Sequence, residues 1–459
     1  MIPISLRELA FITRGVLHQI NDQSADSILI NTVTTNSFRS INSLFIALKG
    51  ECFDGHNFVE NANSVGAIAL LVCHPLTVNC PQIVVEDTRL AMGKLASWIR
   101  SQSKAKVIGI TGSSGKTLVK EMVASILSQR SPTLFTEGNF NNDIGVSLTL
   151  FRLNAMHHYV VIEIGANHIG EIEYITNIVK PDIVLVNNLF NAHINGFGSL
   201  SGVAKAKGEI FHGLTKKGTA VINLSSHDWP NWKYYFNQQS IIWRFSIMKQ
   251  RYANFYAENI SIKSIYSKFE LHTPNGFTSI LLHLPGRHNI ANALAASALA
   301  MSCGATLEEV SFGLSNVKPI FGRLYFINIA PGKLILDDTY NANVGSMIAA
   351  IDVLSQMPGY CILVVGDMAE LGDKTDICHK EIGDAIKKIN INRVFSVGNK
   401  SYLISKHSGC GEHFTSKKEL IDKLISLIKK HEIISVLVKG SRSTSMEEVV
   451  VALREHFLC

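Results

Sequence analysis

A glycine-rich turn joins a short apolar segment to an amphipathic one in the sequence Val107-Ile-Gly-Ile-Thr-Gly-Ser-Ser-Gly-Lys-Thr117. Backbone N–H groups of such a turn, with the positive end of the following helix dipole, can bind nucleotide phosphates. Lys116 would contact the outer phosphates, and the Thr117 hydroxyl would ligate Mg²⁺. The first glycine of the common P-loop spacing would fall on Ile110, so a glycine turn without a ligand is the alternative. The predicted nucleotide-binding residues are Thr111, Gly112, Ser113, Ser114, Gly115, Lys116 and Thr117.

Two polar residues follow other apolar segments. The segment from Tyr159 ends in Glu163, and a carboxylate among apolar side chains is costly unless it is paired or bound to a metal. At the carboxyl end of a parallel strand beside the glycine-rich turn, Glu163 could hold Mg²⁺. A structural carboxylate that caps the next turn is the alternative. His193 follows the segment 182–188 and would lie on the same side of the sheet, although a loop histidine is often only a surface residue.

The composition is that of a globular protein, because 46% of the 459 residues are hydrophobic. The formal net charge is only +6, and no long Lys/Arg block occurs, so we expect no nucleic-acid partner. The apolar stretch 65–73 is too short to span a bilayer, and the N-terminus lacks the pattern of a secretory signal. The 8 cysteines form no C-x-x-C pair, which favours free thiols in a cytoplasmic protein without membrane insertion.

The candidate residues must be positioned by alternating strands and helices. Continuous β-branched runs in the middle of the chain are typical of parallel strands covered on both faces. Predicted strands there lie near 107–110, 159–164, 183–187 and 219–222, and predicted helices at 116–129 and 288–303. Residues 225–284 are irregular and aromatic-rich and would add strands or loops.

The two ends of the chain show related patterns. The first hundred residues carry short β-rich runs at 28–34, 44–48, 67–72 and 82–85, then a helix at 90–98. Predicted strands at 333–337, 361–365, 393–397 and 434–438 alternate with helices at 345–356, 377–388, 417–430 and 445–456. This alternation indicates a doubly wound unit. We therefore predict an α/β protein with a small α/β domain (1–100), a central P-loop-type domain with a mostly parallel sheet (101–314) and a Rossmann-like domain (315–459).

Motifs along nearly the whole chain resemble those of the Mur ligases of peptidoglycan synthesis. They include Leu44–Gly50, Phe53–Asn57, Thr111–Thr117, Gly138–Gly145, Glu163–Ile172, His193 with Gly196–Gly198, Ala204–Ile210, Pro285–Asn289, Gly322-Arg323, Asp337–Asn343, Gly366–Gly372 and Lys439–Ser443. Within the family, Gly165–His168 and Gly366–Gly372 favour the branch that adds D-alanyl-D-alanine. The alternatives are a sister amide ligase, such as the third-residue-adding Mur enzyme or a folylpolyglutamate synthase, and a P-loop ATPase or switch protein that makes no bond.

The resemblance implies an ATP- and Mg²⁺-dependent amide ligase that acts as a monomer. Its first domain would bind the uridine diphosphate end of UDP-N-acetylmuramoyl-tripeptide, its central domain would bind ATP, and its last domain would close over the nucleotide. The tripeptide carboxylate would attack the γ-phosphate to give an acyl phosphate, and the amine of D-alanyl-D-alanine would then attack that carbonyl. Cations are required because both reactants of the first step are anions.

The resemblance also assigns roles to single residues. Thr117 and Glu163 would hold one Mg²⁺, and His193 would help to hold a second together with Lys207 as an N-carbamate. The alternatives for Lys207 are that it is an ordinary surface lysine, or that the family's lysine aligns with Lys205 instead.

The predicted catalytic residues are Lys116, Glu163, His193, Lys207 and Arg323, the last brought to the ATP phosphates by domain closure. Predicted nucleotide contacts are Asn289, Asp338 and Asn341, and predicted substrate contacts are Ser37, Arg39, Lys49, Asn142, Lys439, Ser441 and Arg442, with capping or surface roles as alternatives.

Two segments depart from the family pattern. Thr35-Asn-Ser-Phe-Arg39 replaces the usual Asp-Ser-Arg core, which should alter the uridine contact. Val344 and Gly345 replace a typical Pro-Asp, which should loosen the start of a helix and weaken a nucleotide contact. His157, His158 and the cluster 229–232 match no site, and we expect them only to pack.

Overall fold

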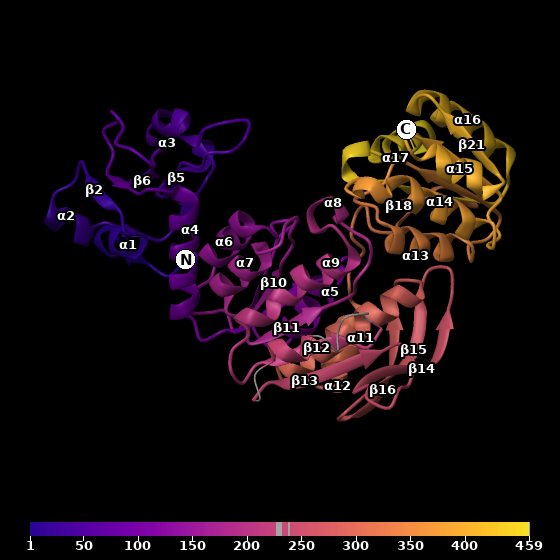
Figure 1. The fold of residues 1–459 in the computed structure, drawn as a ribbon, viewed down its shortest axis with the longest axis horizontal. Coiled ribbons are helices and arrows are strands. Elements are labelled where there is room, and N and C mark those ends of the chain that lie inside the picture. The colour runs from indigo at the N-terminus through magenta and orange to yellow at the C-terminus, as the bar shows by residue number, and fades with distance from the viewer. Residues whose placement is uncertain (226–231, 237–238, 459) are drawn as a thin grey trace.

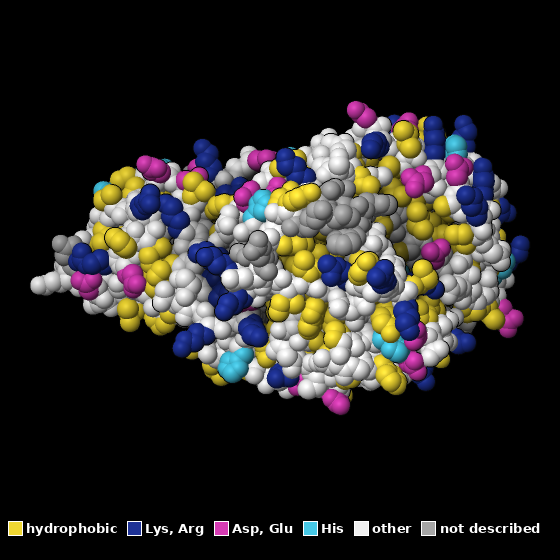
Figure 2. Space-filling view, turned by 60° about the horizontal axis from the view of Figure 1, so that its bottom comes forward, with side chains coloured by type: hydrophobic (Ala, Val, Ile, Leu, Met, Phe, Trp, Pro, Cys, Tyr) yellow, Lys and Arg dark blue, Asp and Glu magenta, His cyan; other side chains and the backbone are white. Residues whose placement is uncertain are grey.

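The computed structural model describes residues 1–225, 232–236 and 239–458. Three large sheets follow one another along the chain, beside a separate two-stranded pair, and Figure 1 shows the first and last of the three at opposite ends of a central part. This arrangement confirms the predicted α/β class with mostly parallel sheets. Within the described ranges, no helix is long and apolar enough to cross a membrane. On the face seen in Figure 2, Lys and Arg side chains are interspersed with acidic and apolar ones.

The N-terminal part is a five-stranded sheet in the order β2-β7-β6-β5-β4 with a separate two-stranded pair, β1-β3. Its strands are β1 (Ile4–Ser5), β2 (Val16–His18), β3 (Leu29–Ile30), β4 (Val33–Thr34), β5 (Leu44–Ile46), β6 (Ala69–Val72) and β7 (Gln82–Val84). Its helices are α1 (Leu6–Thr13), α2 (Asp22–Ser27), α3 (Val59–Val65) and α4 (Thr88–Gln102). The β-rich run predicted at 28–34 consists of two short strands, β3 and β4, which belong to different sheets.

The central part is a nine-stranded sheet in the order β16-β15-β14-β13-β12-β11-β8-β10-β9. Its strands are β8 (Lys106–Thr111), β9 (Thr133–Phe135), β10 (Tyr159–Glu163), β11 (Ile183–Val186), β12 (Thr219–Asn223), β13 (Ile241–Ser246), β14 (Phe255–Ile262), β15 (Ser267–Thr273) and β16 (Gly276–Leu282). Pairing is parallel from β9 to β14, and β15 and β16 extend the sheet antiparallel. The irregular segment after 225 therefore contributes strands; residues 229–231 of the Trp cluster lie outside the described residues, and Trp232 is buried.

Helices cover both faces of this sheet. They are α5 (Lys116–Leu127), α6 (Asp143–Phe151), α7 (Glu171–Val179), α8 (Ile194–Phe197), α9 (Leu200–Gly208), α11 (Arg287–Ser302) and α12 (Leu307–Ser315). Ile108 and Ile110 of β8 pack into a core with α5, α11 and α12, whereas Val107 packs with α4 and α7. A strand buried on both faces must be apolar at successive positions, which explains the continuous β-branched runs. In the register of the three middle strands, Glu163 lies opposite Ile110 and Val186 opposite Thr111.

The C-terminal part is a six-stranded sheet in the order β17-β18-β22-β19-β20-β21. Its strands are β17 (Tyr325–Ala330), β18 (Lys333–Asp338), β19 (Tyr360–Val365), β20 (Arg393–Val397), β21 (Gly411–Phe414) and β22 (Ile434–Lys439). Its helices are α13 (Val344–Leu354), α14 (Thr375–Ile386), α15 (Tyr402–Ser408), α16 (Lys417–Lys430) and α17 (Glu447–Leu458). Pairing is parallel except for β17, and α13 with α14 and α16 with α17 contribute to two separate cores.

The start of α13 is firmly capped. The side chain of Asn343 accepts a hydrogen bond from the Ser346 N–H (2.9 Å), and the Ser346 hydroxyl accepts one from the Asn343 N–H (3.0 Å). This reciprocal pair satisfies two N–H groups at the start of the helix. The helix start therefore keeps a cap at Asn343 without the proline and the acid, and the expected loosening stays a prediction.

Candidate active site

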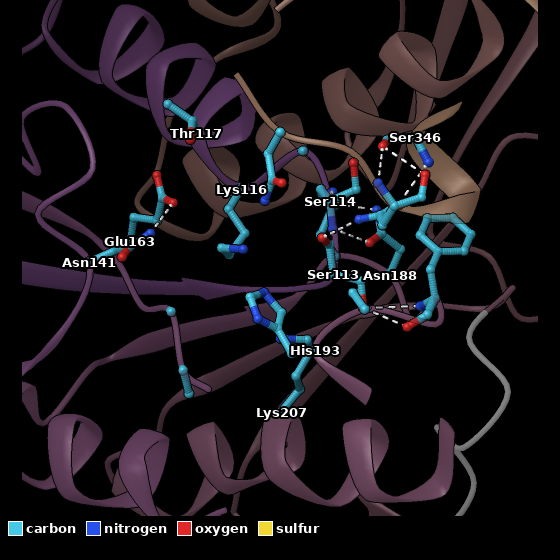
Figure 3. Close-up of a pocket in the computed structure, with 18 of the residues that line it drawn as sticks. Ser113, Ser114, Lys116, Thr117, Asn141, Glu163, Asn188, His193, Lys207 and Ser346 are labelled. Atoms are coloured by element: carbon cyan, nitrogen blue, oxygen red, sulfur yellow. Dashed lines mark hydrogen bonds between the residues drawn. The ribbon is translucent and has the colours of Figure 1, made fainter. Parts of the chain in front are cut away.

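A cavity of about 810 Å³ lies where the three parts of the chain meet. The N-terminal part contributes Arg89, the central part contributes the glycine-rich turn and the ends of its strands, and the C-terminal part contributes the loops after β18 and β19. Figure 3 shows Lys116, Glu163, His193 and Lys207 converging on this space from different elements. The cavity is large enough for a small-molecule ligand of nucleotide size.

The glycine-rich turn has the backbone geometry of an anion site. Gly115 precedes α5 with φ 76°, in the left-handed region, and no side chain caps the helix. A Cβ atom on Gly115 would lie 2.6 Å from the Asn292 side chain, so only glycine fits. Asn188 fixes the turn through two hydrogen bonds: it accepts one from the Ser114 N–H (2.8 Å) and donates one to the Ser114 carbonyl (3.0 Å). The free N–H groups at the start of α5 can therefore face an anion.

Lys116 extends from the first turn of α5 into the cavity (Figure 3). Its Nζ donates to the carbonyl of Gly112 at 2.9 Å. Burial lowers the pKa of Lys116, while the negative charge of Glu163 acts in the opposite direction. A phosphate would replace the carbonyl with a stronger, charged acceptor.

Glu163 has one carboxylate oxygen that no described residue binds. The side chain is 2% exposed, and its Oε1 accepts a hydrogen bond from the Asn141 amide (2.8 Å). Its Oε2 is buried without a hydrogen-bond partner among the described residues. An orphaned carboxylate oxygen in the interior is costly, and a divalent cation would satisfy it. Glu163 is therefore suited to holding Mg²⁺.

Arg323 reaches the glycine-rich turn from the C-terminal part. Its Nη2 donates to the Thr117 hydroxyl at 2.9 Å, and its guanidinium lies 4.2 Å from the centroid of the Tyr340 ring. The Tyr340 N–H in turn donates to the carbonyl of Gly322 (3.0 Å). The stacked, hydrogen-bonded arginine is thus held over the first turn of α5.

Lys207 of α9 is buried and faces the cavity, whereas Lys205 on the same helix is exposed. The structure thus places Lys207, and not Lys205, at the cavity. Burial and then the charge of Lys116 lower the pKa of Lys207 well below its usual range. Its Nζ lies 5.7 Å from the centroid of the Phe197 ring. A neutral amine in this position can act as a nucleophile.

His193 precedes α8 in the left-handed conformation, with φ 54°. Its Nδ1 lies 2.6 Å from Oε2 of Glu370, in the loop after β19. The hydrogen bond from His193 lowers the pKa of Glu370. The Asn195 N–H also donates to the Glu370 carbonyl at 3.1 Å, so this loop of the C-terminal part docks beside the histidine.

Several other predicted nucleotide residues line the same cavity. Asn289 is buried, and its amide donates to the carbonyl of Pro285 (2.7 Å). Lys439 pairs with Asp338 at 2.6 Å and donates to the Asn341 carbonyl at 2.8 Å. Lys439 therefore positions the loop after β18, and its charge is already compensated.

The other predicted substrate contacts, except Asn142, lie outside the cavity lining. Asn142 lines it but caps α6 by accepting the Gly145 N–H (2.9 Å). Ser441 is buried outside the lining and accepts the Ala369 N–H (2.8 Å), while Arg442 pairs at the surface with Glu447 (3.0 Å). The remaining three, Ser37, Arg39 and Lys49, lie in the N-terminal part outside the cavity lining.

The altered segment at 35–39 forms a short 3-10 helix, Ser37–Arg39. The Asn36 side chain accepts the Phe38 N–H (2.9 Å) and so performs the capping that an aspartate could perform. Phe38 is 75% exposed, and Arg39 is exposed beside it.

Sequence reasoning did not assign Asn141, Glu370 or His288 to the site. Asn141 and Glu370 lie within quoted motifs, but their contacts join residues far apart in the sequence. Burial and then the charge of Lys439 lower the pKa of His288 to about 4, so this cavity-lining histidine is neutral at physiological pH. The signal for Asn141 was its place among three asparagines, Asn139, Asn141 and Asn142, just before an apolar helix.

The sequence and the fold of the chain match those of one protein family. The model of the Mur ligase middle domain matches residues 110–300, and that of the Mur ligase glutamate ligase domain matches residues 322–442. The UDP-N-acetylmuramoyl-tripeptide--D-alanyl-D-alanine ligase of Escherichia coli (strain K12) is 53% identical, with 100% of both chains covered. The protein of the same name from Bacillus subtilis (strain 168) is 33% identical, with 99% of both chains covered. A crystal structure of MurF from Acinetobacter baumannii has a TM-score of 0.93 and 37% identity, with 99% of both chains covered.

Proposed function

Because this chain belongs to the Mur ligase family, we propose that it joins D-alanyl-D-alanine to UDP-N-acetylmuramoyl-tripeptide in an ATP-dependent reaction. The product is the UDP-linked pentapeptide precursor of peptidoglycan. The observation that carries the proposal is the convergence of Lys116, Glu163 and Lys207 on one cavity, in a chain that is similar over its full length to ligases of this name. The reaction forms an amide bond and releases ADP and phosphate.

ATP binds with its phosphates on the turn 111–117. The N–H groups at the start of α5 bind phosphate oxygens, and Lys116 moves its ammonium from the Gly112 carbonyl to the outer phosphates. Arg323 adds a second positive charge beside Thr117. Both cations compensate for the repulsion between the γ-phosphate and the incoming carboxylate. Asn289, Asp338 and Asn341 lie along the remainder of the nucleotide cleft.

Thr117 and Glu163 are the residues that would hold the first Mg²⁺. The orphaned Oε2 of Glu163 and the Thr117 hydroxyl are oxygen ligands of the kind that this cation prefers. When bound, Mg²⁺ withdraws charge from the phosphates and orients them for transfer. Asn141 fixes the carboxylate from its other oxygen.

His193 and Lys207 would hold a second Mg²⁺, with Lys207 as a carbamate. The low pKa of Lys207 favours a neutral amine, which attacks carbon dioxide to form an N–C bond and loses one proton. The resulting carbamate is anionic and offers two oxygens as metal ligands. Glu370 orients His193 from the opposite side.

The reaction then has two steps. A carboxylate oxygen of the tripeptide attacks the γ-phosphorus, the bond to ADP breaks, and an acyl phosphate forms. The amine of D-alanyl-D-alanine attacks the acyl carbon, and the tetrahedral intermediate collapses with release of phosphate and a proton. Lys116 remains with the transferred phosphoryl group and stabilises the charge that develops on its oxygens.

Each of the three parts of the chain has its own binding function in this proposal. We assign residues 1–100 to the uridine end of the tripeptide substrate, residues 101–314 to ATP and Mg²⁺, and residues 315–459 to closure over ATP and the acceptor. Ser37, Arg39 and Lys49 belong to the first of these surfaces in this proposal. A monomer contains the complete set of residues, and the UDP-linked substrate and ATP indicate a cytoplasmic reaction.

The proposal is tested by following product and phosphate together. Purified protein with Mg²⁺, ATP, UDP-N-acetylmuramoyl-tripeptide and D-alanyl-D-alanine should yield the UDP-linked pentapeptide by mass spectrometry. Single amino acids should not replace the dipeptide, which separates this ligase from its sister enzymes. Phosphate release that needs neither substrate would contradict the proposal and indicate a switch protein.

A further inference from the structure

Phe190 packs against Gly345 across the junction of the central and C-terminal parts. Phe190 lies in the loop that follows β11, and Gly345 lies in the first turn of α13. A Cβ atom on Gly345 would lie 2.5 Å from Cγ, 2.6 Å from Cδ1 and 2.7 Å from Cδ2 of the Phe190 ring. These separations are far shorter than van der Waals contact, so the ring occupies the space that a side chain at position 345 would need.

The same contact is tied to the phosphate-binding turn through Ser113. The Phe190 N–H donates to the Ser113 hydroxyl (3.0 Å), which donates in turn to the Phe190 carbonyl (3.2 Å). From the other side, the Asn343 amide donates to the Ser113 carbonyl (3.2 Å) while the same side chain caps α13 at Ser346 (Figure 3). Ser113 therefore binds both the backbone of Phe190 and the start of the helix that the Phe190 ring contacts.

The backbone alone does not require glycine at position 345. Gly345 is absent from the glycines with positive φ, and it lies within a helix, where alanine is favoured over glycine. Phe190 is 37% exposed, although it is a large aromatic residue whose backbone is held by two hydrogen bonds with the Ser113 hydroxyl. Both features are explained if the ring and the bare helix turn are fitted to one another.

We propose that Phe190 and Gly345 are a positioning pair that fixes where α13 docks on the phosphate-binding turn, and with it the place of Arg323 beside Thr117. Neither residue takes part in bond making. The pair acts by setting the distance between the two parts of the chain at Ser113. Its kinetic consequences depend on the proposed function, whereas the docking itself does not.

A double-mutant cycle tests the pair. Gly345→Ala should lower kcat/KM for ATP by about tenfold, the scale expected when one methyl group is forced into a packed contact. Phe190→Ala should lower it by about threefold or less, because it removes contacts without creating a clash. In the background of Phe190→Ala, the further change Gly345→Ala should cost nothing. Asp352→Ala, on the exposed face of α13, is the matched control and should leave kcat/KM unchanged.

Hydrogen exchange measures the docking of α13 on the phosphate-binding turn in the absence of substrates. Amides in residues 188–195 and 343–348 should exchange faster in Gly345→Ala than in the wild type, and the double variant should match Phe190→Ala. The inference is wrong if Gly345→Ala changes neither exchange nor kinetics, or if its effect is equally large with and without Phe190. A wild-type protein that makes no pentapeptide would refute the proposed function, while the exchange cycle would still decide the docking contact.

Discussion

Arg323 of the C-terminal part donates a hydrogen bond to Thr117, 206 residues earlier in the chain, at 2.9 Å. The acceptor is the hydroxyl expected to ligate Mg²⁺, and the donor is the arginine expected to arrive by domain closure. The contact shows that the two parts of the chain lie close enough for a guanidinium to reach the phosphate-binding turn. Stacking on Tyr340 holds that guanidinium in place. The Arg323 side chain therefore links the position of the C-terminal part to the chemistry at the phosphate-binding turn.

Replacing Arg323 tests this link. Arg323→Ala should lower kcat by about 10²-fold or more, since one charged group that stabilises a transition state commonly contributes that much. Arg323→Lys should recover part of the loss, because it restores the charge without the planar fork. Initial rates of ADP release measure the effect, with Arg393→Ala at an exposed strand end as the control. Full turnover by Arg323→Ala would remove the arginine from the mechanism.

Glu163→Gln probes the metal site with almost no change of shape. The Asn141 contact on Oε1 can persist, but the free oxygen is replaced by an NH₂ group, whose nitrogen cannot ligate Mg²⁺. We expect the Mg²⁺ concentration for half-maximal activity to rise and kcat to fall by about 10²-fold. A magnesium titration of the initial rate is the measurement. Glu137→Gln, at an exposed carboxylate outside the cavity lining, should behave as the wild type. An unchanged titration of Glu163→Gln would exclude the carboxylate as a ligand.

Lys207→Met should make the protein more stable and inactive. A buried amine without a countercharge is costly, so its replacement should raise the free energy of unfolding by about 1–3 kcal/mol. Between the lowered pKa of Lys207 and its usual value, the unfolded chain binds a proton that the folded chain does not, so wild-type stability should rise with pH there. Lys207→Met should flatten that rise. Denaturant unfolding at several pH values tests this, and the exposed Lys205→Met is the control.

The carbamate itself has a separate test. Lys207→Ala leaves space near the predicted second metal, and short carboxylates such as formate or acetate could supply the missing oxygens. We expect partial recovery of activity with added carboxylate in this variant and none in Lys205→Ala. The absence of recovery, together with full activity of the wild type after exhaustive removal of carbon dioxide, would contradict the carbamate.

Glu370→Gln should weaken docking of the C-terminal loop on His193. The hydrogen bond from His193 lowers the pKa of Glu370, so the contact stabilises the protein above the carboxyl's unfolded pKa and is lost as pH falls through the lowered value. The stability difference between wild type and variant should therefore be present near pH 7 and shrink toward acid pH. Urea unfolding at both ends of this range measures it. Glu455→Gln, at an exposed carboxylate of α17, is the control for the loss of one surface charge. A difference that grows on acidification would have the wrong sign for this account.

Local patterns in the sequence were sufficient for the sheet strands around the turn and for the turn itself. β8, β10 and β11 were recognisable because strands buried on both faces must be apolar throughout. β9 and β17 were missed, since a three-residue strand and an antiparallel edge strand carry little periodic signal. The sequence analysis chose Lys207 and kept Lys205 as the alternative, and spacing supports that choice, because Lys207 lies four residues after buried Val203 on α9.

Contacts between the parts of the chain were beyond the reach of the sequence. The pairs His193–Glu370 and Phe190–Gly345 join the central and C-terminal parts, and Glu163–Asn141 joins two segments of the central part; in none of the three does the sequence indicate that the two residues lie close together. The substitution of Pro-Asp at 344–345 seemed a weakness in the sequence alone. In the structure, Asn343 caps the helix, and the bare Gly345 accommodates a ring.

The most direct test of the central claim follows oxygen from substrate to product. The tripeptide carboxylate is labelled with ¹⁸O, and the wild-type protein is allowed one turnover with ATP, Mg²⁺ and D-alanyl-D-alanine. Activation as an acyl phosphate predicts that one labelled oxygen appears in the released phosphate for each pentapeptide formed. Pentapeptide formed with unlabelled phosphate would contradict carboxylate activation by the ATP held at residues 111–117.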